Sequence, residues 1–81
     1  MSKNDEKTIK IIYESNEIPV AIENNYTNAL KSIMLTFNFT QDDMEKIKIL
    51  FIDSDGDKIR LKEENFEDAY ESEIWEISKK N

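Results

Sequence analysis

The stretch KIKILFIDSDGDKIRL, Lys46–Leu61, contains two strand patterns and the turn that joins them. Its first part, Lys46–Ile52, is rich in β-branched and other apolar residues and is the strongest strand signal in the chain. Asp53–Asp57 follows and contains the only glycine of the sequence, Gly56, within an Asp-Gly pair of the kind that forms turns. Lys58–Leu61 alternates again. The stretch therefore predicts a β-hairpin whose turn is acidic.

The residues before this hairpin predict another hairpin and a helix. Thr8–Tyr13 and Ile18–Ile22 each have the composition and alternation of a strand, with polar residues between them. Pro19 cannot donate a backbone hydrogen bond, so the second of these strands is expected at a sheet edge. Asn28–Phe37 has apolar residues at helical spacing, and Thr27 is the expected N-cap.

The residues after the acidic hairpin complete an α+β order. Asn65–Tyr70 predicts a short helix and Glu73–Ile77 a last strand, in which Trp75 is expected in the core. The order ββαββαβ resembles the ubiquitin-like β-grasp, which implies a mixed sheet with one main helix packed across it. One face of that sheet should stay exposed, because a single helix cannot cover both. We expect a domain over residues 8–78, with flexible segments at 1–7 and 79–81.

Composition restricts the partners. The 81 residues suffice for one small domain, and 18 acidic against 11 basic residues give a net charge of −7. Nucleic acids and anionic membranes need a basic surface, so neither is expected as a partner. A basic protein surface or a metal cation fits better. Neither a membrane-spanning run nor a signal peptide is visible, and we expect a cytoplasmic protein.

Catalysis is not expected. The sequence has no cysteine and no histidine, which removes thiolate chemistry, the most frequent general base and the most frequent transition-metal ligand. No pair of a nucleophile and a base is visible elsewhere in the sequence. We therefore expect a protein that is not an enzyme and that needs no cofactor.

The acidic turn permits three interpretations. Counted as a calcium loop of the EF-hand type, its carboxylates at positions 1, 3, 5 and 12 are Asp53, Asp55, Asp57 and Glu64. That loop needs glycine at position 6, where this chain has Lys58, and it lies between helices instead of strands. A second interpretation is a solvated turn. Because neighbouring carboxylates repel one another, we favour a third, in which a cationic partner offsets them.

The stretch LFIDSDGDKIRLKEENFEDAY, Leu50–Tyr70, resembles the acidic OPCA motif of PB1 domains. In that motif a strand with an aromatic residue leads into D-x-[D/E]-G-D, followed by a short strand and an acid at the start of a short helix. The matching residues are Phe51, Asp53, Asp55, Gly56, Asp57, Ile59, Leu61, Glu64, Phe66 and Ala69. The spacing before Phe66 is slightly shorter than in the motif, which leaves Glu63, Glu64 and Glu67 as alternatives for the distal acid.

The resemblance implies a protein–protein interaction module of a signalling or scaffold protein. Its acidic face would bind the basic, lysine-bearing face of a partner PB1 domain. The residues implied for the acidic face are Asp53, Asp55, Asp57, Glu63, Glu64 and Glu67, with no metal. The other interpretations left open are a calcium-binding loop on a β-grasp scaffold and a ubiquitin-like adaptor that is not conjugated, since the chain ends EISKKN without Gly-Gly.

Lys10 is the candidate for a basic face of this chain. It occupies the place of the family's lysine on the first strand, and the alternation of that strand directs it away from Ile9 and Ile11. A chain with both faces can also associate weakly head to tail with itself. Four further cations either extend a basic patch or pair locally: Lys31, Lys46, Lys48 and Arg60.

Overall fold

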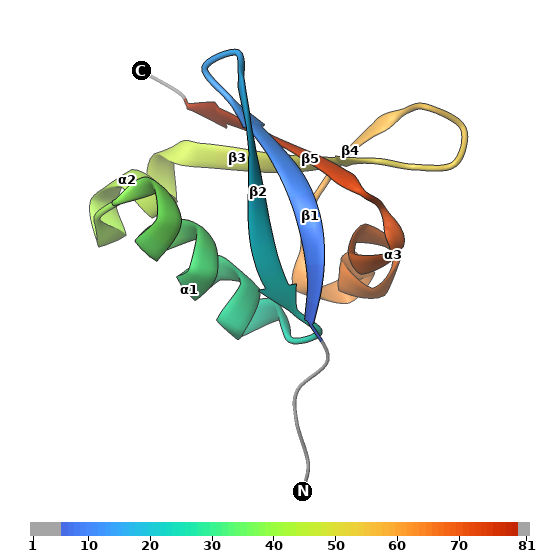
Figure 1. Ribbon diagram of the computed structural model, residues 1–81, viewed down its shortest axis with the longest axis horizontal. Coiled ribbons are helices and arrows are strands. Elements are labelled where there is room, and N and C mark those ends of the chain that lie inside the picture. The colour runs from blue at the N-terminus through green and yellow to red at the C-terminus, as the bar shows by residue number, and fades with distance from the viewer. Residues whose placement is uncertain (1–5, 80–81) are drawn as a thin grey trace, which may run out of the picture.

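Five strands form one mixed sheet in the order β2-β1-β5-β3-β4 (Figure 1). The structure, a computed structural model, describes residues 6–79. Its elements are β1 (Glu6–Tyr13), β2 (Asn16–Glu23), α1 (Tyr26–Phe37), α2 (Gln41–Lys46), β3 (Ile47–Ile52), β4 (Lys58–Arg60), the 3-10 helix η1 (Glu63–Asn65), α3 (Phe66–Glu71) and β5 (Ile74–Lys79). The α+β class and the mixed sheet are as predicted. β1 begins at Glu6 and β5 ends at Lys79, so each strand includes residues that were predicted to be flexible. The remaining residues of those segments, 1–5 and 80–81, lie outside the described residues.

The sheet is mixed because β1 and β5 are parallel, while the other neighbouring strands are antiparallel. β2 lies at one edge, as the proline predicts, and Pro19 is opposite Lys10 of β1. The missing N–H of Pro19 interrupts the row of donors along this edge, and such an interruption disfavours pairing with another strand.

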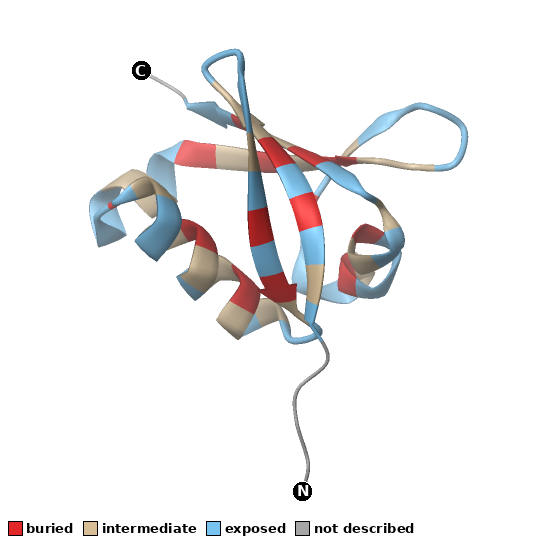
Figure 2. Ribbon diagram, in the orientation of Figure 1, coloured by how far each residue is buried: buried red, intermediate tan, exposed pale blue. Residues whose placement is uncertain are grey.

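The core lies between α1 and one face of the sheet (Figure 2). Alternate residues of each strand are buried there, as in β1, where Ile9 and Ile11 are fully buried. Trp75 is also fully buried, as predicted, and α1 contributes Ala29 and Ile33. The intervening strand residues point to the other face, which no helix covers among the described residues and where Lys10 is exposed. The predicted exposed face and the orientation of Lys10 are therefore confirmed.

Two local predictions are wrong. The chain forms an additional helix, α2, where the sequence suggested only a break before the strand, so the observed order contains two helices between the hairpins. Thr40 and Asp43 start α2 with a capping box: the Asp43 N–H donates to Thr40 Oγ1 (3.1 Å) and the Thr40 N–H donates to Asp43 Oδ2 (3.0 Å). This bond from the Thr40 backbone lowers the pKa of Asp43.

The N-cap of α1 is Asn25 and not Thr27, because the Asn25 side chain accepts the Asn28 N–H (3.0 Å).

The turn between β1 and β2 provides a test of local strain. Its two residues, Glu14 and Ser15, both have positive φ, at 51° and 67°. This two-residue turn prefers Asn and Gly. We predict that Glu14→Asn combined with Ser15→Gly raises the free energy of unfolding by about 1 kcal/mol, because both residues adopt positive φ at lower cost. Urea unfolding measures the change. Ser15→Ala, which keeps the strain, should give no gain, and a double variant no more stable than wild type would contradict the prediction.

Candidate functional site

The acidic turn is organised by the first of its aspartates. Asp53 Oδ1 accepts hydrogen bonds from the Asp55 N–H (2.9 Å) and the Asp57 N–H (2.8 Å). The Gly56 N–H donates to the Asp53 carbonyl (3.0 Å), and Gly56 has a φ of 86°, which glycine adopts without strain. One carboxylate therefore shapes the turn, while the side chains of Asp55 and Asp57 are exposed.

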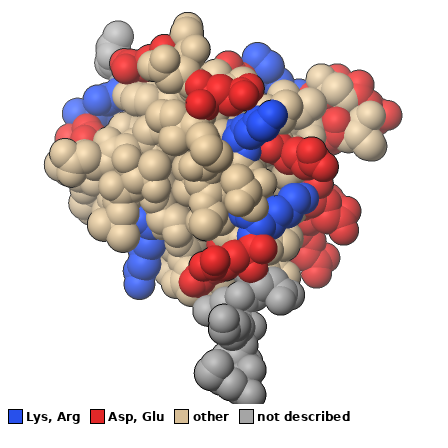
Figure 3. Space-filling model, in the orientation of Figure 1, with Lys and Arg blue, Asp and Glu red and all other residues tan. Residues whose placement is uncertain are grey.

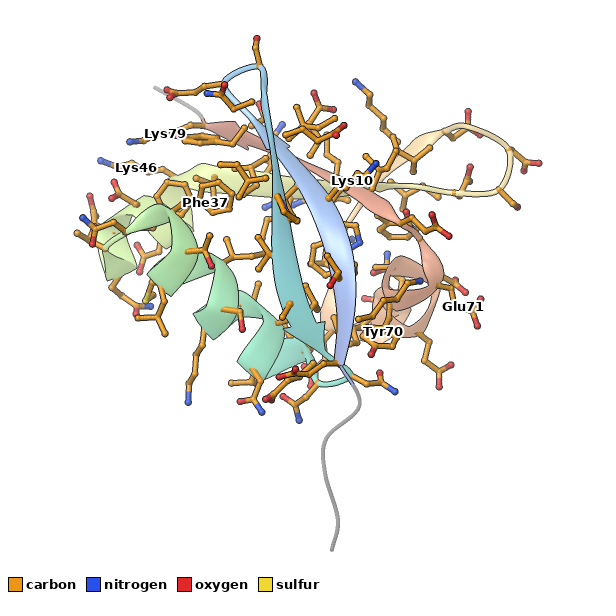
Figure 4. The ribbon with its side chains drawn as sticks, viewed as in Figure 1. Lys10, Phe37, Lys46, Tyr70, Glu71 and Lys79 are labelled. Atoms are coloured by element: carbon orange, nitrogen blue, oxygen red, sulfur yellow. The ribbon has the colours of Figure 1, made fainter. Side chains whose placement is uncertain are left out.

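A groove with a volume of about 610 Å³ lies beside this turn, between the end of β3, the start of β5 and α3. Its lining combines carboxylates with isoleucines. The residues that line it are Phe51, Ile52, Asp53, Ser54, Ile59, Asp68, Glu71, Ser72, Glu73 and Ile74. We name it the acidic groove. Figure 3 shows acidic side chains gathered over the β3–β4 loop and α3, and Figure 4 shows Glu71 on α3 at this side of the molecule.

The carboxylates of the acidic groove differ from most of those that the sequence suggested. Of the predicted acids, Asp53 lines it. Asp55 and Asp57 are exposed on the turn next to it, and the exposed Glu63, Glu64 and Glu67 lie on η1 and at the start of α3 without lining it. Sequence reasoning missed three lining acids: Asp68, Glu71 and Glu73. Asp68 and Glu71 are three residues apart on α3, a spacing that places side chains on one face of a helix. The predicted helix ended at Tyr70, so the sequence did not place Glu71 on that face.

The acids of the groove are not neutralised by any other residue that the structure describes. Among residues 6–79, Asp53, Asp68, Glu71 and Glu73 form no ion pair. The isoleucines beside them offer an apolar surface. Such a combination fits a lysine or arginine side chain, whose methylene groups pack on apolar surface while its charged end meets carboxylates.

Lys10 lies close to the acidic groove in the sheet. It pairs in register with Ile74 of β5, which lines the groove, and the Lys10 N–H donates to the Glu73 carbonyl (3.0 Å). Its side chain is exposed on the uncovered face (Figure 4), and Lys10 Nζ is 3.9 Å from Glu17 Oε1. A contact this long between exposed groups contributes little to stability, so Lys10 remains available to a partner.

Comparison of the chain with protein-family models, curated proteins and solved structures found no match. Among the described residues, no helix combines the length and the apolar character needed to cross a bilayer. The site must therefore be interpreted from its own chemistry.

The calcium interpretation makes a separate prediction. Oxygens of Asp53, Asp55 and Asp57 lie within 4.8 Å of one another, a spacing that a cation can bridge. However, Asp53 Oδ1 already accepts two backbone N–H groups, and β4 follows the turn directly. We predict no saturable chemical-shift changes in an NMR titration with calcium. Saturation with a dissociation constant of roughly 10⁻⁵ M or tighter would contradict this.

The role of Asp53 in the turn can be separated from its charge. Asp53→Ala removes both hydrogen bonds, and we predict that it lowers the free energy of unfolding by about 1–2 kcal/mol. Asp53→Asn keeps an oxygen acceptor without the charge and should cost clearly less. Urea unfolding of both variants measures the difference. Equal losses in the two variants would show that the hydrogen bonds do not hold the turn.

Proposed function

We propose that this chain is a protein–protein interaction module of the PB1 type, which binds a basic side chain of a partner protein in its acidic groove. The observation that carries the proposal is the groove itself. Four carboxylates without an ion pair among the described residues surround an apolar surface made by isoleucines.

The fold supports the same proposal. The sheet order, the parallel pair β1·β5 and the helix α1 across one face are compatible with a ubiquitin-like β-grasp, in spite of the additional α2. The acidic turn lies at the end of β3, where the OPCA resemblance implies the partner-binding acids. In such a module Asp55 and Asp57 would attract and orient the partner's cations, while the acids of the groove would bind them.

Charge on both sides of the contact determines its energetics. A partner lysine that enters the groove loses part of its hydration and gains charge-assisted hydrogen bonds to carboxylates, while neighbouring acids lose their mutual repulsion. The field of a chain with net charge −7 also speeds the encounter with a basic partner. We propose Lys10 as the corresponding basic residue of this chain, with weak head-to-tail self-association as its consequence.

We predict that Asp68→Asn combined with Glu71→Gln weakens partner binding roughly thirtyfold, about 2 kcal/mol, because the partner's cation is left without its acceptors. Both residues are exposed on α3, so the fold should be retained. The partner is captured from a lysate of the source cells, purified and measured by calorimetry. Asp55→Ala combined with Asp57→Ala should weaken binding as well.

The matched control is Glu14→Gln combined with Glu45→Gln, which removes the same charge from exposed positions outside the groove. It should retain nearly full affinity, and circular dichroism should show that all variants are folded. Full affinity of the groove variant, or an equal loss in the control, would refute the proposed site and leave only a general effect of net charge.

A further inference from the structure

Lys7 stands at a position of β1 where the alternation of the strand favours an apolar residue. Ile9 and Ile11 are fully buried, and Lys7, two residues before Ile9, points to the same face of the sheet. Its neighbour across the hairpin, Ile22, is also fully buried. Lys7 itself is half-buried. Removing the charged group of a lysine from water is costly unless that group meets a polar partner, so a lysine at this position indicates a specific contact.

The partner of Lys7 is the end of α3. Lys7 Nζ donates a hydrogen bond to the Tyr70 carbonyl (2.9 Å) and lies 5.8 Å from the centroid of the Tyr70 ring. The register of β1 with β5 begins at Lys10, so α3 can lie beside the part of β1 that precedes Lys10 (Figure 1 and Figure 4). The last carbonyl groups of a helix have no partner within the helix, and a lysine there satisfies one of them and favours the helix dipole.

Two side chains from different strands therefore bind consecutive carbonyl groups of α3. Trp75 of β5 donates to the Ala69 carbonyl (2.8 Å), and Lys7 of β1 donates to the carbonyl of the next residue. A helix of six residues is not stable alone, so its orientation follows from such contacts. Two contacts from different strands leave a short helix less freedom to rotate than one does. That orientation decides where Asp68 and Glu71 lie in the acidic groove.

Lys7 also offsets the charge of α3. The charged side chains of this helix are all acids, Glu67, Asp68 and Glu71, and among residues 6–79 no lysine or arginine forms an ion pair with them. Glu71 is the last residue of α3, where a carboxylate is disfavoured because the carbonyl groups of that turn carry negative partial charge. The ammonium group of Lys7 reduces this cost. Lys7 does not line the groove, so it leaves the place of a partner's cation open.

We propose that Lys7 is a positioning residue of the acidic groove, which holds the end of α3 and thereby fixes where Asp68 and Glu71 meet a cation of the partner. This role rests on the proposed function, because the position of the two acids matters only if the groove binds a cation. Removal of Lys7 should then weaken the binding of another cation. A purely electrostatic role of Lys7 predicts the opposite, since the loss of a positive charge makes the surface more attractive to a cation.

The first test measures whether Lys7 holds α3 in the free chain. Lys7→Met keeps an unbranched apolar side chain and removes the ammonium group. The Ser72 N–H and the Trp75 Nε1–H report on the end of α3, because both donate to the Ala69 carbonyl. We expect these two protons to exchange with solvent about tenfold faster in Lys7→Met, in excess of any change at the amides of β3. Lys7→Arg keeps a cationic donor and should restore slow exchange.

The second test measures binding of a blocked peptide of alternating lysine and alanine, which is titrated into the ¹⁵N-labelled chain. In the wild type we expect saturable shifts at the amides of the groove residues Asp68, Glu71 and Glu73. Lys7→Met should bind the peptide about fivefold more weakly, because the two acids on α3 no longer meet the lysine together. Lys7→Arg should bind it within about twofold of the wild type.

Two control variants separate positioning from charge and from stability. Lys31→Met removes a cation from the exposed surface of α1, outside the groove, and should leave the affinity unchanged or slightly higher. Ile47→Val shortens a buried side chain at the start of β3, whereas the groove lies at the end of that strand. This change lowers the stability of the fold and should leave the affinity unchanged.

Three results would overturn the role of Lys7 while the groove itself still binds the peptide. The first is exchange at the Ser72 N–H and the Trp75 Nε1–H that changes no more than exchange in β3. The second is an affinity of Lys7→Met equal to or higher than that of the wild type. The third is a loss of affinity in Ile47→Val as large as that in Lys7→Met. If the wild type shows no saturable shifts up to millimolar peptide, the groove is not a cation site, and the proposed function fails together with this role.

Discussion

The indole of Trp75 holds α3 against the sheet, and the candidate site depends on that contact. Trp75 is fully buried on β5, and its Nε1–H donates to the Ala69 carbonyl of α3 (2.8 Å). Its ring also packs edge-on against Phe66, with centroids 6.3 Å apart. A helix of six residues is too short to be stable alone, so its position comes from such packing. Helix α3 forms one wall of the acidic groove. The buried hydrogen bond from Trp75 to Ala69 therefore helps to fix the positions of Asp68 and Glu71.

The alternation of the strands explains why this small sheet has two different surfaces. On β1, Ile9 and Ile11 enter the core, so Lys10 and Ile12 must point the other way. The same rule applies to β3 and β5, and the outward residues of adjacent strands then fall into rows. With α1 on one side only, those rows remain exposed. The acidic groove forms instead at an end of the sheet, where the β3–β4 turn leaves the strand layer.

The sequence predicted the parts of the structure that depend on short-range pattern. Strand alternation located Lys10 and Trp75 correctly, and the chemistry of Pro19 located the sheet edge. Helix α2 was missed although Thr40 and Asp43 form a capping box, because the signal is short and the helix has no buried residue. Asn25 and Thr27 are both good caps, and in the structure Asn25 has the extended backbone of an N-cap and accepts the Asn28 N–H. The groove acids depend on how α3 packs against β5, and no local pattern contains that information.

The distribution of ion pairs gives the strongest reason to treat the acidic groove as a binding surface. Between residues 6 and 79, the lysines that have a carboxylate within 4 Å all find it outside the groove: Lys10 with Glu17, Lys46 with Asp42, Lys58 with Glu76 and Lys79 with Asp43. The hydrogen bond that Lys46 Nζ donates to Asp42 Oδ2 (3.0 Å) raises the pKa of Lys46. A surface arranged for stability alone would place cations beside its densest acids, since neighbouring carboxylates repel one another. Leaving such acids without counterions lowers the stability of the free chain, and sites that bind a ligand commonly accept that loss. A cation supplied by a partner removes the repulsion, so binding and stabilisation of the fold would occur together.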